Sequence, residues 1–146
     1  MSQTAPALKL TLPKGRIQEK VSELLASVGL AFKASPRSYR PVCSDPAIEA
    51  KTLKPQNIPA LIALGRHDCG FTGADWVYEQ RADVVELLDL GFDPVRIVAA
   101  MPEDLLNGPH NPLNDKSRQI VVASEYRRLS EDFIAKHALN AVYVQS

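Results

Sequence analysis

Short apolar stretches alternate along this chain with segments of helical periodicity, and this alternation restricts the folds that are open to it. Residues 9–12 (Lys-Leu-Thr-Leu) favour a strand, which Pro13 and Gly15 end. A helical pattern follows from Ile17 and stops at Gly29. The same order recurs to the end of the chain. Strands that alternate with helices are typical of α/β proteins with a largely parallel sheet, so we predict that class.

The other predicted elements continue the alternation. Strands are predicted over residues 48–53, 69–73, 84–88, 95–100, 119–123 and 141–144. Helices are predicted over residues 55–65, 74–80 and 125–137. Residues 35–41 suit a loop or an irregular strand, and residues 102–115, rich in proline and asparagine, are the only candidate for a long loop or linker.

The charge balance excludes one broad class of function. Lysine and arginine together number 17, as do aspartate and glutamate, so the formal net charge is zero. A general nucleic-acid binder needs a surplus of basic residues, although a local basic pocket for a small phosphorylated ligand remains open.

The cysteines and the N-terminal residues bear on the compartment. Cys43 and Cys69 have neither a close-spaced partner nor metal-type spacing, so we expect reduced, inert thiols. The first eight residues lack a basic region and an apolar core, and the apolar runs are too short to cross a bilayer. We therefore expect a soluble, cytoplasmic protein that binds neither nucleic acid nor membrane.

A basic turn is the first candidate site. Lys14, Gly15 and Arg16 lie between the first predicted strand and the first predicted helix. Ligands of open α/β sheets bind beyond the carboxyl ends of strands, where helix N-termini point N–H groups outward. A lysine and an arginine there suit an anion, because they supply a point charge and a bidentate fork. A solvated basic turn is the alternative, and position alone leaves the two readings about even.

A glycine-containing turn is the second candidate. Gly70 and Gly73 let the backbone approach a ligand without a Cβ in the way, Thr72 can donate to a phosphate, and Asp75 can cap the next helix. The alternative, which this segment by itself favours, is that the glycines only shape a tight strand-to-helix turn.

An Asp–Arg segment is the third candidate. Asp89 follows a predicted strand, and Arg96 lies near the start of the next one. A structural salt bridge across the turn is the more frequent outcome. A carboxylate at a strand end can also hold ribose hydroxyls, as in nucleotide-binding folds.

Taken in order, these segments resemble the ATP phosphoribosyltransferases, which catalyse the first step of histidine biosynthesis. The resemblance runs through LPKGRI, SPRSYRP, KPQNIPALIALGRHDCGFTGAD and VVELLDLGFDPVRIVAA, and continues weakly to about Val144. It implies a two-lobed fold of the type II periplasmic-binding-protein kind, with the active site between the lobes. Residues 1–94 would form the first lobe, and residues 95–146 the beginning of an incomplete second lobe.

The resemblance also implies a reaction and a set of residues. The reaction transfers a phosphoribosyl group from phosphoribosyl pyrophosphate to N1 of ATP and depends on Mg²⁺. A homo-oligomer, with or without a regulatory subunit, is implied too. The residues that match the family's substrate-binding segments are Lys14, Gly15, Arg16, Arg40, Asp68, Gly70, Thr72, Gly73, Asp89 and Arg96.

The departure from the family pattern comes at the end of the sequence. Family members carry a glycine-rich loop that cradles a phosphate, and the sequence reaches Ser146 before any such loop. We therefore expect a fragment of a longer enzyme, with an activity that is incomplete without the rest. A non-catalytic relative that binds a nucleotide or a partner subunit is the runner-up, and a solute-binding protein of the same shape is a third reading.

Overall fold

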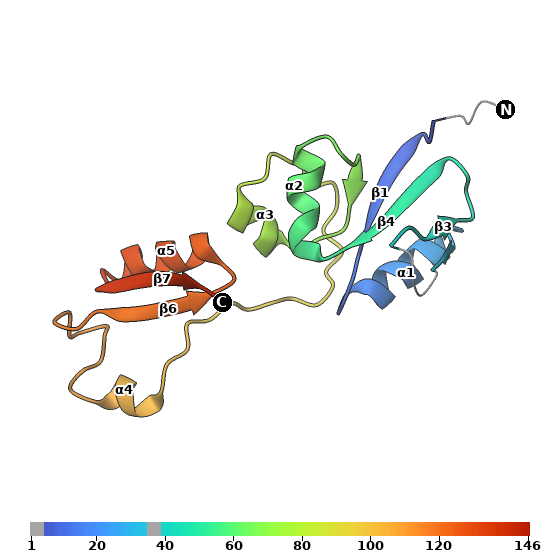
Figure 1. The fold of residues 1–146 in the computed structure, drawn as a ribbon. Helices are drawn as coiled ribbons and strands as arrows, with labels where there is room; N and C mark the ends of the chain where they lie inside the picture. Colours follow the sequence, from blue (N-terminus) through green and yellow to red (C-terminus); the bar gives the residue numbers. More distant parts are fainter. Residues whose placement is uncertain (1–4, 35–38) are drawn as a thin grey trace. The chain divides into compact units, whose positions relative to one another are not determined.

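The computed structural model describes residues 5–34 and 39–146, and the chain divides into two compact units (Figure 1). Unit 1 comprises Met1–Pro94 and unit 2 comprises Val95–Ser146. Both units mix helices with strands, so the predicted α/β class is confirmed. Part of the predicted 35–41 loop lies outside the described residues.

A five-stranded sheet forms the centre of unit 1. Its spatial order is β2 (Phe32–Lys33), β3 (Val42–Cys43), β4 (Ile48–Leu53), β1 (Leu8–Pro13) and β5 (Cys69–Gly70). β1 runs parallel to both of its neighbours, as predicted, whereas β3 runs antiparallel to β2 and to β4. The sequence did not indicate β2 or β3, because strands of two residues carry too short a pattern to detect.

β1 is buried on both of its faces. Leu10 and Leu12 pack with Val21 and Leu25 of α1 (Gln18–Ser27) in the main apolar cluster. Thr11 points the other way and is completely buried beside Ile58 of α2 (Ile58–Ala63). A strand covered on both faces is typical of the parallel part of α/β sheets.

Several predicted elements of unit 1 are confirmed with adjusted bounds. The first helix ends where predicted, because Gly29 adopts the left-handed conformation with φ +84. The predicted helix at residues 55–65 consists of a 3₁₀ turn, Pro55–Asn57, followed by α2. The predicted helix at 74–80 is α3 (Ala74–Gln80), whereas the predicted strand at 69–73 is shorter and ends at Gly70.

Two predicted strands are wrong. Residues 84–88 and 95–100 follow irregular paths, and none of the described residues pairs with them as a strand. Most of their apolar side chains face solvent, with Val85 82% and Leu87 83% exposed. The residue types favour strands, but a strand also needs a neighbour that completes its backbone hydrogen bonds.

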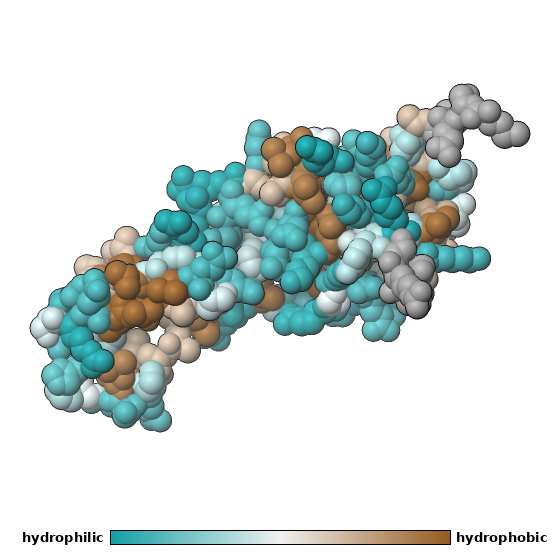
Figure 2. Space-filling model, in the orientation of Figure 1, coloured by the Kyte–Doolittle hydropathy of each residue, from teal (hydrophilic) through white to brown (hydrophobic). Residues whose placement is uncertain are grey.

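Unit 2 is a strand–helix–strand motif. β6 (Ile120–Ser124) and β7 (Ala141–Gln145) run parallel and are joined by α5 (Arg127–Lys136), as the sequence predicted. Ahead of them lies a short helix, α4 (Glu103–Asn107), where we expected only a loop. Alternate side chains of the two strands remain exposed, and Figure 2 shows hydrophobic residues gathered on the surface of this region.

Gly70 generates the first prediction, because its position is set by packing. A Cβ added there would lie 1.7 Å from Oγ1 of the buried Thr11. We expect Gly70→Ala to lower the free energy of unfolding by about 1–3 kcal/mol, the usual cost of overpacking a core. Urea denaturation followed by circular dichroism measures this loss.

Two further variants make the test specific. In Gly73→Ala the added Cβ would crowd the movable end of the Asp75 side chain and make an ordinary contact with Trp76, so we expect a smaller loss. The double variant Thr11→Ala/Gly70→Ala should lose less stability than the sum of the two single variants. Strict additivity would contradict the proposed contact.

Candidate anion-binding site

The basic turn predicted from the sequence lies at the carboxyl end of the central strand. Lys14 follows β1 directly, and its backbone N–H donates to the Leu53 carbonyl at 2.8 Å. Gly15 has φ +85, a conformation that glycine adopts without strain, and its carbonyl accepts from the N–H of Gln18. Arg16 is exposed just before α1 begins. The chain thus turns sharply and leaves both cations at the end of the sheet.

A third cation stands at the same edge. Pro13 pairs in register with Leu53, so the next residues, Lys14 and Lys54, leave neighbouring parallel strands side by side. Lys54 is exposed. Sequence reasoning missed Lys54, although the start of a helix at Pro55 marked the end of the strand. Only the pairing of β1 with β4 brings these two lysines together.

The strand order of the sheet reverses at β1. β4 lies on one side of β1 and β5 on the other, and α1 and α2 cover opposite faces (Figure 1). In open α/β sheets, ligands bind at the carboxyl edge where the strand order reverses. The basic turn therefore occupies the usual ligand position of its fold.

An aromatic ring holds the first of these cations. The ammonium nitrogen of Lys14 lies 3.5 Å from the centre of the Tyr39 ring. The backbone carbonyl of Tyr39 accepts from the N–H of Thr52 at 2.7 Å, which fixes this residue beside the end of β4. Sequence reasoning did not select Tyr39, because no local pattern links it to Lys14.

An acidic group contacts the start of α1. Asp93 bonds to the ammonium group of Lys20 at 2.6 Å and lies in the turn that ends unit 1. The hydrogen bond from Lys20, and then the positive charges of Lys20 and Arg16, hold the pKa of Asp93 below its ordinary value. The neighbouring Phe92 packs against the apolar cluster of the unit. This turn, 73 residues away in sequence, is thereby anchored to α1.

The glycine-containing turn follows β5 at the same carboxyl edge, but its groups already have partners. Gly70 accommodates the side chain of Thr11, and the hydroxyl of Thr72 donates to the Pro55 carbonyl at 2.8 Å. Gly73 itself occupies the N-cap position of α3, and Asp75 lies within the first turn of that helix. Asp75 is thus two residues beyond the N-cap position, where its negative charge faces the positive end of the helix dipole. Ligand binding by Gly70, Thr72 and Gly73 stays a prediction.

Two other predicted residues contact residues outside the basic turn. Asp68 precedes β5 at the amino end of the sheet, where it accepts from the backbone N–H of Lys9 at 2.7 Å. Arg40 is exposed and pairs with Glu49 at 3.5 Å. Both contacts are structural, and a substrate role for either residue stays a prediction.

The Asp–Arg segment spans the boundary between the units. Asp89 belongs to unit 1 and accepts from the backbone N–H of Gly91 at 2.9 Å, which is a local turn. Arg96 is exposed in unit 2. Their pairing, like their contact with substrate, stays a prediction.

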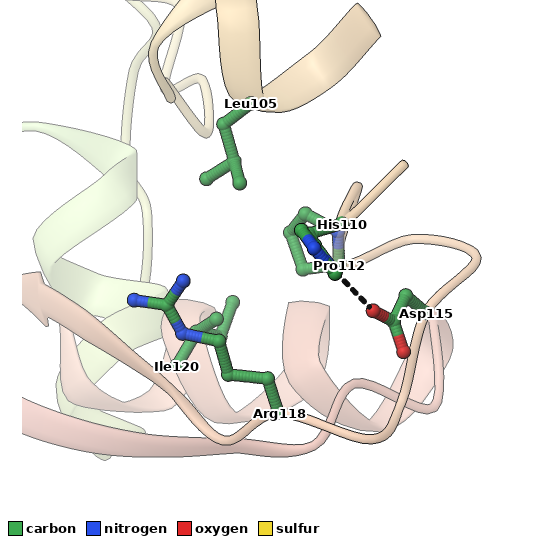
Figure 3. Close-up of a pocket in the computed structure, with 6 residues that line it drawn as sticks. All are labelled: Leu105, His110, Pro112, Asp115, Arg118 and Ile120. Atoms are coloured by element: carbon green, nitrogen blue, oxygen red, sulfur yellow. Dashed lines mark hydrogen bonds and ion pairs between the residues drawn. The ribbon is translucent and has the colours of Figure 1, made fainter. Parts of the chain in front are cut away.

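A separate pocket of about 70 Å³ lies within unit 2 (Figure 3). It is lined by Leu105, His110, Pro112, Asp115, Arg118 and Ile120. Hydrogen bonds from Ser117, and then from His110, hold the pKa of Asp115 well below its ordinary value. Those contacts tie the loop together, and the pocket is too small for a nucleotide.

Two searches of the described residues concern other kinds of site. Within residues 5–34 and 39–146, no group of three or more histidine, cysteine or acidic side chains is arranged to hold a metal ion. Over the same residues, none of the helices is long and apolar enough to cross a bilayer. Both cysteines are free thiols, and burial raises the pKa of Cys69.

Fold and site together define a class: an α/β protein with a cationic carboxyl edge suited to a small phosphorylated ligand. Comparison with known proteins gives the family. The sequence model of the ATP phosphoribosyltransferase family, HisG, matches residues 54–146. The chain belongs to the ATP phosphoribosyltransferase family, which confirms the resemblance seen in the sequence.

Individual relatives agree with this assignment. The ATP phosphoribosyltransferase of Chlorobaculum parvum is 36% identical over 146 residues, which cover 97% of this chain and 48% of that protein. The enzyme of Thermodesulfovibrio yellowstonii is 44% identical over 102 residues, covering 66% of this chain and 35% of that protein. The chain thus spans about half the length of the curated relatives it matches.

A solved structure shares the fold. It is described as the ATP phosphoribosyltransferase HisG:HisZ complex from Thermotoga maritima. The matched chain superimposes with a TM-score of 0.66 at 20% identity, covering 95% of this chain and 64% of that one. At this identity the likeness concerns the fold alone.

The Lys20–Asp93 contact generates a prediction about pH. We expect Lys20→Met to raise the pKa of Asp93 toward its ordinary value, because the hydrogen bond is the main cause of the depression. A depressed carboxyl pKa stabilises the folded state above the ordinary value, and that stabilisation is lost as the pH falls through the depressed value. Carbon-13 NMR of the aspartate carboxyl groups measures the pKa.

Lys20→Arg is the matched control, because it keeps the charge and the capacity to donate. We expect the pKa of Asp93 to stay low in this variant. An equal rise in both variants would mean that Lys20 does not set the titration of Asp93.

Proposed function

We propose that this chain provides one wall of the active site of an ATP phosphoribosyltransferase, with the cationic edge of unit 1 binding substrate phosphates. The observation that carries the proposal is the convergence of Lys14, Arg16 and Lys54 at the carboxyl ends of β1 and β4. Membership of the family supplies the reaction class. Both proposed substrates, ATP and phosphoribosyl pyrophosphate, are polyanions, and a cationic strand edge suits such ligands.

The proposed reaction is a substitution at an anomeric carbon. A bond forms between N1 of the adenine and C1 of the ribose, while the bond from C1 to oxygen breaks. Pyrophosphate leaves with the bonding electron pair. The transition state resembles an oxocarbenium ion, so catalysis depends on positioning two polyanions and on stabilising the departing charge. Fixed cations contribute to both.

Mg²⁺ belongs to this proposal as a companion of the phosphates. Such ions are usually bound by one or two carboxylates together with substrate phosphates, and they keep several water molecules. The ion would neutralise charge on the leaving pyrophosphate.

The larger architecture is proposed on the same basis. Units 1 and 2 correspond to the two lobes of a type II periplasmic-binding-protein fold, with unit 2 supplying part of the second lobe. A homo-oligomer is part of this proposal. The related Thermotoga maritima structure is a complex of HisG with HisZ, which supports an additional regulatory subunit for this protein.

A second function, binding without catalysis, is favoured by one observation. The chain spans about half the length of its curated relatives, so residues on which their turnover depends can lie outside it. Calorimetry with ATP and with phosphoribosyl pyrophosphate, alongside an assay of pyrophosphate release, separates the two functions. Turnover by the full-length gene product supports the enzyme, and binding without turnover by that product supports the alternative.

We expect Lys14→Ala and Arg16→Ala each to weaken binding of ATP or phosphoribosyl pyrophosphate. The expected loss is about 1–3 kcal/mol, the range for a hydrogen bond to a charged group. Titration calorimetry at constant ionic strength measures this loss, because surface electrostatics depend on salt.

Arg118→Ala in the unit 2 pocket is the control, since it removes one positive charge from unit 2 and leaves Lys14, Arg16 and Lys54 of unit 1 intact. It should leave binding nearly unchanged. The anion-binding assignment is wrong if all three variants bind as the unaltered chain does.

A further inference from the structure

The Lys14–Tyr39 contact differs from other contacts of basic side chains in unit 1. The Lys14 ammonium lies over an aromatic ring, 3.5 Å from its centre. Lys20 and Arg40 instead pair with the carboxylates of Asp93 and Glu49. The contrast matters because a carboxylate neutralises its partner, whereas a ring does not.

A ring attracts a cation through its electron-rich face and leaves the ammonium N–H groups able to donate elsewhere. An incoming phosphate would have to displace a carboxylate from Lys20 or Arg40. It can bind to Lys14 while the ring contact persists. The ring thus restricts the motion of a long, flexible side chain without occupying its charge.

The backbone holds Tyr39 in the position that this role needs. Its carbonyl accepts from the N–H of Thr52, which pairs in register with Leu12, two residues before Lys14. The Tyr39 residue is 62% exposed and stands at the edge where Lys14 and Lys54 emerge. A ligand can therefore approach this corner from solvent.

We infer that Tyr39 is a positioning residue, which holds Lys14 over the carboxyl edge of the sheet in readiness for a phosphate or pyrophosphate group. The inference rests on the proposed function for the chemistry of the ligand. It adds a residue that acts through Lys14, and it explains how a flexible lysine is ordered before the anion binds. Restricting a side chain in advance lowers the entropy lost on binding.

Tyr39→Leu and Tyr39→Phe test this inference in the full chain, with inorganic pyrophosphate as the probe. Leucine removes the aromatic face, whereas phenylalanine retains it. We expect Tyr39→Leu to weaken pyrophosphate binding about two- to five-fold, the value of an exposed cation–π contact, and Tyr39→Phe to restore it. Tyr78→Leu, which removes an exposed tyrosine of α3, should bind as the unaltered chain does.

Proton NMR provides a readout that does not depend on the ligand. The methylene protons next to the Lys14 ammonium should be shifted upfield by the ring in the unaltered chain and in Tyr39→Phe. In Tyr39→Leu they should return to the ordinary position for lysine. An ordinary position in the unaltered chain would overturn the contact itself, and with it the inference.

A further variant, Lys14→Met, separates this inference from the proposed function. If Lys14→Met weakens pyrophosphate binding and Tyr39→Leu does not, Tyr39 has no positioning role and the anion site stands. If neither substitution weakens binding, both ideas fail. In the double variant Lys14→Met/Tyr39→Leu, we expect pyrophosphate binding no weaker than in Lys14→Met alone. If Tyr39→Leu weakens binding as much in the Lys14→Met background as in the unaltered chain, the ring contacts the anion directly. That outcome also overturns a role through Lys14.

Discussion

The parallel pairing of β1 with β4 is the constraint on which the rest of unit 1 depends. Six residue pairs hold the two strands in register, from Leu8 with Ile48 to Pro13 with Leu53. The pairing places β1 in the interior of the sheet. Successive side chains of a strand point to opposite faces, so those of β1 contact α1 on one face and α2 on the other. It also makes both strands end at one level, so that Lys14 and Lys54 leave the sheet together. A shift of one residue would reverse the faces and separate the cations.

The chemistry of the cationic edge follows from which positive charges are already neutralised. Lys20 forms an ion pair with Asp93 and anchors the last turn of unit 1, whereas Lys14 is held by an aromatic ring. Exposed ion pairs contribute little stability. The Lys20–Asp93 pair matters for placing the segment that leads into unit 2. Two basic residues near this edge therefore have different roles. The Lys20–Asp93 ion pair anchors a distant segment of the chain, whereas the Lys14–Tyr39 contact leaves the charge of Lys14 available to a ligand.

Local signals explain how much of the fold could be predicted from the sequence. Helical periodicity ended by Gly29, the proline that opens the 55–65 helix, and the strand–helix–strand pattern after residue 118 all depend on near neighbours in sequence. The failures have a common cause. Residues 84–88 and 95–100 have side chains that favour strands, but strand formation depends on a distant partner. The short β3 pairs with the edge of β4, and β2 pairs in turn with β3, so both depend on residues outside their own segments.

By itself the sequence determined the α/β class, the family and the basic turn after the first strand, because each is written in residue types and their spacing. Tertiary structure alone decided what surrounds that turn. In the folded chain, the Tyr39 ring contacts Lys14, Asp93 forms an ion pair with Lys20, and Gly70 packs against Thr11. Tertiary structure also placed Asp68 at the amino edge. The physical reason is that strand register brings together residues tens of positions apart in sequence. Such contacts cannot be predicted from a local sequence pattern.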